Sequence, residues 1–120
     1  MRRTGLVRIR RHRAGFFEAQ ARPGSGRHGE MLADFLQSDV QGDAATAQAL
    51  LAEIAAAERG EAPQPGGAGN AFSIAIAPGG AVIRNAVVAD AAPEHYRLAE
   101  LRTALEAWAA AIGRPRRGIG

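Results

Sequence analysis

The chain has 120 residues and a net charge of +3, so it is long enough to bury one hydrophobic core and too short for two, and we expect a single domain over residues 1–120. Cysteine is absent, which excludes disulfides, thiolate metal sites and cysteine nucleophiles, and no apolar run is long enough to span a membrane. We therefore expect a cytoplasmic protein, and the abundance of Arg, Ala and Gly is typical of a GC-rich bacterial genome.

Residues 5–21 are predicted to form a β-hairpin. Apolar and charged residues alternate over residues 6–10, which is the period of a half-buried strand. Ala14 and Gly15 can turn the chain, and residues 16–20 are predicted to form the returning strand.

Residues 30–59 are predicted to form two helices, because their apolar residues recur at helical spacing. Gly42 separates the two helices, Asp43 is a suitable N-cap for the second, and Gly60 follows its end as a C-cap. Residues 60–69 are rich in Gly and Pro and have little to bury, so they are predicted to form a loop.

A second hairpin is predicted over residues 70–88. Apolar residues alternate with small ones in its first strand, and a Gly-rich turn at residues 78–80 reverses the chain. Residues 91–94 follow and are predicted to form a turn.

A continuous apolar stripe predicts the last helix over residues 98–112, with Leu101, Leu105 and Trp108 facing a sheet. Residues 113–120 are expected to form a flexible tail. The order of hairpin, helices, hairpin and helix predicts an α+β fold, in which the two hairpins form one antiparallel sheet with the helices packed on one face.

The core is expected to be thin, because alanine makes up half of the apolar residues. We therefore expect apolar surface to remain exposed after folding. A homodimer formed through that surface, or through a free hairpin edge, is predicted.

Patterns typical of catalysis or of cofactor binding are weak. Residues 24–29 match G-x-G-x-x-G, which can place backbone amides against a pyrophosphate, but the preceding strand belongs to an antiparallel hairpin, so we interpret the segment as a flexible connector. His12, His28 and His95 are scattered and are predicted to lie on the surface, and a turn explains the neighbouring Glu94 and His95. We predict a protein that is not an enzyme, with no catalytic residue, cofactor or metal site.

Acidic residues gather in the predicted helical region. An acidic helix face can dock a basic protein partner through complementary charge, as inhibitors of nucleases and other toxins do. The leading hypothesis is therefore a protein-interaction module of the immunity or inhibitor type. The candidate partner-binding residues are Asp34, Asp39, Asp43 and Glu53.

The basic N-terminal segment supports an alternative function, because residues 1–27 contain eight arginines and one glutamate. Arg8, Arg10, Arg11 and Arg13 lie in the first predicted hairpin, where several would project from one strand face toward phosphates. Nucleic-acid binding through these residues competes with the interpretation that they are solvated and pair with the acidic part of the chain. The aromatic residues available there, at positions 16 and 17, are expected to belong to the core.

The layout of residues 69–112 resembles the YacL-type family of small proteobacterial proteins. The features shared are an apolar-alternating strand over residues 72–76, a Gly turn, the strand over residues 82–85 and an amphipathic helix that reaches Trp108. The same layout is similar to many small immunity proteins of bacterial toxin systems. Both resemblances imply a cytoplasmic protein without enzyme activity, and they transfer no site residues.

Overall fold

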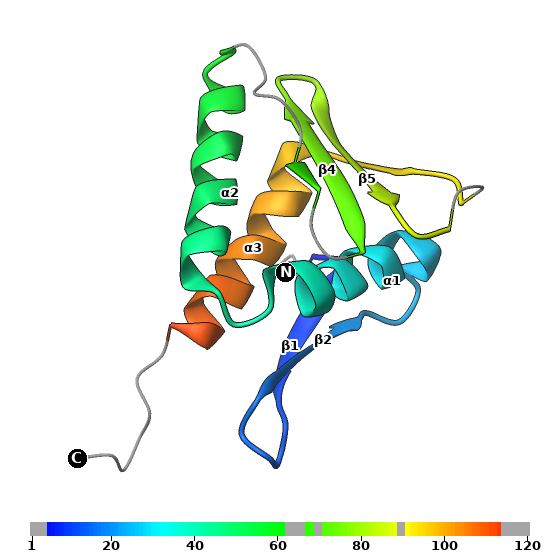
Figure 1. Ribbon diagram of the computed structural model, residues 1–120, viewed down its shortest axis with the longest axis vertical. Helices are drawn as coiled ribbons and strands as arrows, with labels where there is room; N and C mark the ends of the chain where they lie inside the picture. Colours follow the sequence, from blue (N-terminus) through cyan, green and yellow to red (C-terminus); the bar gives the residue numbers. More distant parts are fainter. Residues whose placement is uncertain (1–4, 62–66, 69–70, 89–90, 114–120) are drawn as a thin grey trace.

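The computed structural model describes residues 5–61, 67–68, 71–88 and 91–113, and it confirms the predicted α+β fold. The elements follow one another in the predicted order of hairpin, helices, hairpin and helix (Figure 1). They are β1 (Val7–Arg11), β2 (Phe17–Ala21), α1 (Gly26–Phe35), the π-helical turn η1 (Leu36–Val40), α2 (Ala44–Glu58), β3 (Gly67–Ala68), β4 (Phe72–Ala77), β5 (Gly80–Asn85), β6 (Glu94–Tyr96) and α3 (Leu98–Ile112).

The two hairpins form two separate antiparallel sheets, and not the single sheet that the sequence predicted. β1 and β2 form one sheet, with Val7 opposite Ala21, and the other sheet has the strand order β3-β4-β5-β6. The Gln37 side chain occupies the outer edge of β2, where its Oε1 accepts the amide of Ala19 at 2.6 Å and its Nε2 donates to the carbonyl of Phe17 at 3.1 Å. Since β3 and β6 flank β4 and β5, the two hairpins do not share an edge.

Two strands of the larger sheet were not predicted. β3 lies within the predicted loop 60–69, and β6 begins at the end of the predicted turn 91–94. They have two and three residues, which is too short for a visible alternation of apolar and polar side chains, so only pairing with a neighbour defines them. Residues 62–66 and 69–70 of the expected loop, and residues 114–120 of the expected tail, lie outside the described residues.

The glycine-rich segment 24–29 is not the flexible connector that we expected, because it makes the turn before α1 and the first turn of that helix. Gly24 and Gly26 have positive φ angles of 86° and 61°, which glycine adopts without steric cost. Gly29 is buried, and a Cβ added there would lie 2.9 Å from the carbonyl oxygen of Leu6. The glycines therefore allow α1 to pack closely against the first hairpin.

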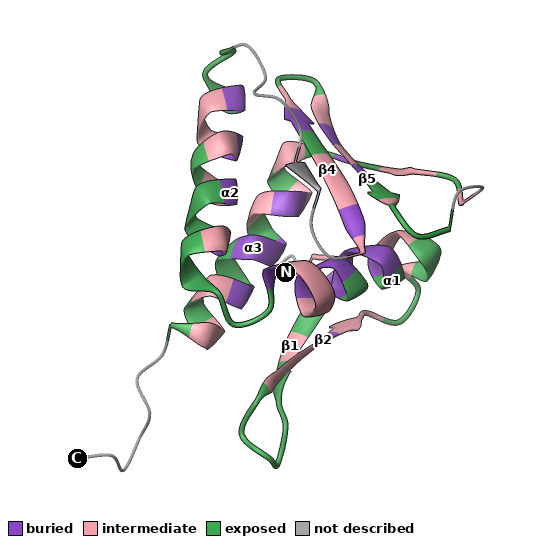
Figure 2. Cartoon of the chain, in the orientation of Figure 1, coloured by how far each residue is buried: buried purple, intermediate pink, exposed green. Residues whose placement is uncertain are grey.

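Helix α3 lies at the centre of the fold, in contact with α2 and with both sheets (Figure 1). Leu101, Leu105 and Trp108 are buried, which confirms the predicted register of this helix. Figure 2 shows that burial is concentrated where the helices face each other and the sheets, whereas the tip of the first hairpin is exposed. The hairpin tip is thus left free of the core.

Less apolar surface remains exposed than the composition suggested. Among the described residues, the large apolar side chains that are exposed are Phe16, Val87 and Val88. Within the same ranges, none of the helices combines the length and the apolar character needed to cross a membrane.

Candidate functional site

The turn end of the first hairpin extends beyond the helices (Figure 1), and the predicted arginines are spread from Arg8, near the start of β1, to Arg13 in the turn. Arg8, Arg10, Arg11 and Arg13 are all exposed. Because side chains alternate along a strand, Arg8 and Arg10 lie on one face of β1 and Arg11 lies on the other, while Arg13 belongs to the turn. The hairpin therefore presents positive charge on both faces.

None of these four arginines forms an ion pair with an acidic residue of the described ranges, although Glu18 lies opposite Arg10 in the hairpin register. Other arginines of the protein are paired. These pairs are Arg27 with Glu94, Arg59 with Glu61, Arg97 with Glu100 and Arg102 with Glu58. The interpretation that the acidic part of the chain neutralises the hairpin is therefore not supported, and the hairpin guanidinium groups can bind an external anion.

Aromatic rings lie among the hairpin arginines. The rings of His12 and Phe16 stack with their centroids 4.3 Å apart, and the Arg11 guanidinium lies 5.7 Å from the centroid of the Phe17 ring. Phe17 packs against the core, as expected, but Phe16 is 52% exposed. An exposed aromatic ring beside unpaired arginines is typical of a surface that binds nucleobases together with phosphates.

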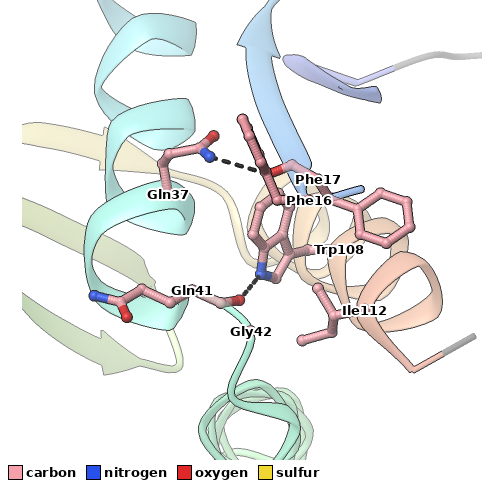
Figure 3. Close-up of a pocket in the computed structure, with 7 residues that line it drawn as sticks. All are labelled: Phe16, Phe17, Gln37, Gln41, Gly42, Trp108 and Ile112. Carbon is pink, nitrogen blue, oxygen red and sulfur yellow. Dashed lines mark hydrogen bonds between the residues drawn. The ribbon is translucent and has the colours of Figure 1, made fainter. Parts of the chain in front are cut away.

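A cavity of about 400 Å³ lies between the hairpin, the end of η1 and the end of α3 (Figure 3). It is lined by Phe16, Phe17, Gln37, Gln41, Gly42, Trp108 and Ile112. Trp108 was expected in the core, and the cavity beside it was not expected from the sequence. No local signal could have revealed it, because its walls come from three segments that are far apart in the chain.

The cavity wall is held by hydrogen bonds between these segments. The indole Nε1 of Trp108 donates to the carbonyl of Gln41 at 2.6 Å (Figure 3). Gln41 has a positive φ of 53°, which is strained for a residue with a side chain. Gln37 bonds to β2, as described above, so the hairpin, η1 and α3 are fixed relative to one another around the cavity.

A second polar cluster joins the beginning of α1 to β6 and α3. His28 Nδ1 lies 2.9 Å from Glu94 Oε1, and His28 Nε2 lies 3.5 Å from Glu100 Oε1. The His28 ring stacks on Tyr96 at 4.2 Å, and the Tyr96 hydroxyl donates to the His28 carbonyl at 2.7 Å. Arg27 adds an ion pair with Glu94. Sequence reasoning missed this cluster because Glu94 is 66 positions from His28.

The electrostatics of this cluster are those of a structural contact. The hydrogen bond from His28, helped by the charge of Arg27, holds the pKa of Glu94 below its usual range, so this carboxylate is ionised at neutral pH. Burial raises the pKa of Tyr96, which keeps its hydroxyl protonated as a donor. Within the described residues, no group of three or more His, Cys, Asp and Glu side chains could hold a metal ion.

The four predicted partner-binding acids do not form one continuous free surface. Asp39 accepts the amides of Ala71 and Phe72, both at 3.1 Å, and so caps the start of β4. Asp43 caps α2 through the amides of Ala45 and Thr46, and the hydroxyl of Thr46 holds the pKa of Asp43 below its usual range.

Asp34 and Glu53 remain on the surface as exposed and half-buried carboxylates. Asp34 lies with Glu30 beside a groove whose lining includes Phe72 and Val88. Partial burial, together with the charge of Glu30, raises the pKa of Asp34 above its usual value. This groove is the part of the predicted acidic face that is available to a partner.

Comparison of the chain with protein-family models, with curated proteins and with solved structures finds no match.

Proposed function

We propose that this protein is a non-enzymatic binding module that contacts nucleic acid through its first hairpin. The observation that carries the proposal is the set of four exposed arginines on a projecting hairpin, none of them paired with a described acidic residue. Four arginines elsewhere in the chain have glutamate partners and Arg84 has none among the described residues, so what distinguishes the hairpin is that four unpaired arginines lie together on it. An acidic partner molecule can supply the missing counter-charges.

A nucleic acid suits this arrangement for two physical reasons. The guanidinium group donates two parallel hydrogen bonds, which match the geometry of phosphate oxygens. A two-stranded β-ribbon is also narrow enough to follow a phosphate backbone or to enter the major groove of a duplex. The strands of the hairpin pack against the helices, but its turn end extends beyond them, so a backbone can approach the exposed arginines there (Figure 1).

Fluorescence anisotropy with labelled single-stranded and duplex oligonucleotides tests the proposal. We expect binding that weakens with salt, with each phosphate contact adding roughly 0.9 to the slope of log K against log salt on duplex DNA. Replacing Arg8, Arg10, Arg11 and Arg13 together by Ala should abolish this binding. The unfolding temperature of that variant should be unchanged, because the four side chains are exposed.

Arg84 offers a matched control for a single hairpin arginine. Like Arg10, it is exposed on a strand and has no ion pair among the described residues. Arg10→Ala should weaken binding and reduce the slope of log K against log salt by about 0.9, the contribution of one phosphate contact. Arg84→Ala should change neither the affinity nor the slope. Equal losses in the two variants, or tighter binding to anionic phospholipid vesicles or polyglutamate than to either oligonucleotide, would contradict nucleic-acid binding.

A second candidate function is docking of a basic protein at the groove beside Asp34. The observation in its favour is the pair of exposed carboxylates, Glu30 and Asp34, in a groove that is also lined by apolar side chains and by Arg27, whose charge is paired with Glu94. A polyarginine peptide is the probe for this function. Asp34→Asn should weaken binding of the polyarginine peptide, and Glu53→Gln tests the other predicted acid that remains on the surface. Unchanged peptide affinity in both variants would exclude this function.

The proposal also includes a cytoplasmic location, a homodimer and kinship with the YacL-type family or with small immunity proteins. The order of hairpin, helices, hairpin and helix supports the kinship. A toxin gene immediately upstream of the gene for this chain would favour an immunity role over nucleic-acid binding.

A further inference from the structure

We propose that the cavity beside the first hairpin takes up an unpaired nucleobase, so that the protein prefers single-stranded to duplex nucleic acid. This inference rests on the proposed function, because the hairpin arginines must bind the phosphates of the same strand. The inference specifies which form of nucleic acid the protein recognises. It is based on the arrangement of the aromatic side chains at the cavity.

The cavity has the volume and the apolar lining that a heterocyclic base requires. Phe16, Phe17, Trp108 and Ile112 give it apolar walls, and Gln37, Gln41 and Gly42 complete its lining. Nucleobases stack on aromatic side chains in proteins that bind single strands, with little dependence on sequence, because every base has a π-face. A volume of about 400 Å³ accommodates one base with its sugar.

The cavity and the arginines are directly connected. Phe17 lines the cavity, and its ring lies under the Arg11 guanidinium. Phe16 also lines the cavity and stacks on His12 in the hairpin turn, next to Arg13. One nucleotide can therefore place its base in the cavity while its phosphate reaches the hairpin, and this charge complementarity identifies the occupant.

The cavity is also preorganised. Trp108 is only 2% exposed and is fixed by its hydrogen bond to the Gln41 carbonyl, and Gln37 joins the hairpin to η1. A rigid aromatic surface loses little conformational entropy when a base binds. A base in a duplex is stacked and paired, so it could enter the cavity only after an unfavourable extrusion from the helix.

The test compares an oligothymidine of about 12 nucleotides with a duplex of the same length in anisotropy titrations of the full chain. Phe16→Ala removes the exposed ring. Val88→Ala is the matched control, because Val88 is as exposed as Phe16, at 53% and 52%, and lies outside this cavity. We expect Phe16→Ala to weaken oligothymidine binding about 10-fold and to leave duplex binding unchanged. Val88→Ala should change neither affinity, and Phe16→Tyr should restore single-strand binding.

The fluorescence of Trp108 gives an independent measurement, because it is the only tryptophan in the chain. A base in the cavity should change its emission, whereas binding at the arginines alone should not. Equal affinity for both oligonucleotides, no effect of Phe16→Ala or an unchanged Trp108 signal at saturation would overturn the inference and leave the proposed function standing. If neither oligonucleotide binds, the proposed function itself fails.

Discussion

At the scale of single residues, the same charged group serves different purposes in different places. Asp39 and Asp43 hold the amides that begin β4 and α2, whereas Asp34 is exposed beside Glu30. Arg27 is paired with Glu94, whereas Arg10 has no acidic partner in the described ranges. Composition alone counts these residues equally, but only those without an internal partner are available for binding.

Asp39 and Asp34 give a prediction that separates a structural acid from a surface acid. Asp39→Ala should lower the free energy of unfolding by about 1–3 kcal/mol, because two amides at the start of β4 lose their acceptor. Asp34→Ala should stay within about 0.5 kcal/mol of the wild type, since Asp34 is exposed and its pKa is raised rather than lowered by its surroundings. Urea denaturation measures both, and equal costs would refute the assignment.

Glu94 predicts a pH dependence of stability. Folding lowers the pKa of Glu94, mainly through the hydrogen bond from His28. The ionised carboxylate therefore stabilises the folded protein at pH values above the ordinary pKa of 4.5. This stabilisation is lost as the pH falls through the lower pKa of the folded state. Glu94→Gln should therefore be less stable than the wild type at neutral pH, and the difference should disappear in acid. Glu106→Gln, an exposed substitution on α3, serves as the control in urea titrations across this range. A difference that does not change with pH would exclude this role.

At the scale of elements, contacts between side chains and backbone determine how the first hairpin packs against α1 and η1. The Gln37 side chain covers the edge of β2 and attaches the hairpin to η1, while Gly29 lets α1 approach Leu6. The first hairpin is therefore attached along both of its strands, and its turn over residues 12–15 is exposed. This is the arrangement expected of an arm that binds a partner.

Gly29 gives a prediction at this scale. Glycine to alanine normally stabilises a helix by roughly 1 kcal/mol, but Gly29→Ala should cost about 1–3 kcal/mol, because the new Cβ would lie 2.9 Å from the Leu6 carbonyl oxygen and close to Ser25. Gly79→Ala is the control, since a Cβ there meets no atom within 4 Å. Chemical denaturation of both variants is the measurement. A stabilised Gly29→Ala protein would show that α1 does not pack as described.

At the scale of the whole molecule, the exposed large apolar side chains of the described residues lie in two places, each beside charged groups. Phe16 lies in the arginine hairpin, which extends to one side (Figure 1), whereas Val87 and Val88 follow the end of β5 in the larger sheet. The helices and the larger sheet bury most of the large apolar side chains. Each chain can therefore fold around its own core, and a partner would meet the arm rather than complete the core.

The proposed homodimer gives a prediction at this scale. Among the described residues, β2 is the only strand that pairs with β1, so the outer edge of β1 can pair with β1 of a second copy, which would bring the arginines of two hairpins together. Salt screens such repulsion, so light scattering should show more dimer as the salt concentration rises, whereas nucleic-acid binding should weaken. A protein that stays monomeric at high micromolar concentration in high salt, or a dimer that dissociates with salt, would contradict pairing through β1.

The sequence by itself determined the elements that have a local cause. The alternation in the two hairpins, the Asp43 cap and the apolar stripe through Trp108 act within a few residues, so β1, β2, β4, β5, α2 and α3 could be predicted. Only the tertiary structure decided the rest: the separation into two sheets, the short strands β3 and β6, and the cavity beside the hairpin. Each depends on groups that are far apart in the chain, such as Gln37 on β2 or His28 with Glu94. Such contacts form only when the whole core folds, because no single segment gains enough by itself to offset the loss of chain entropy.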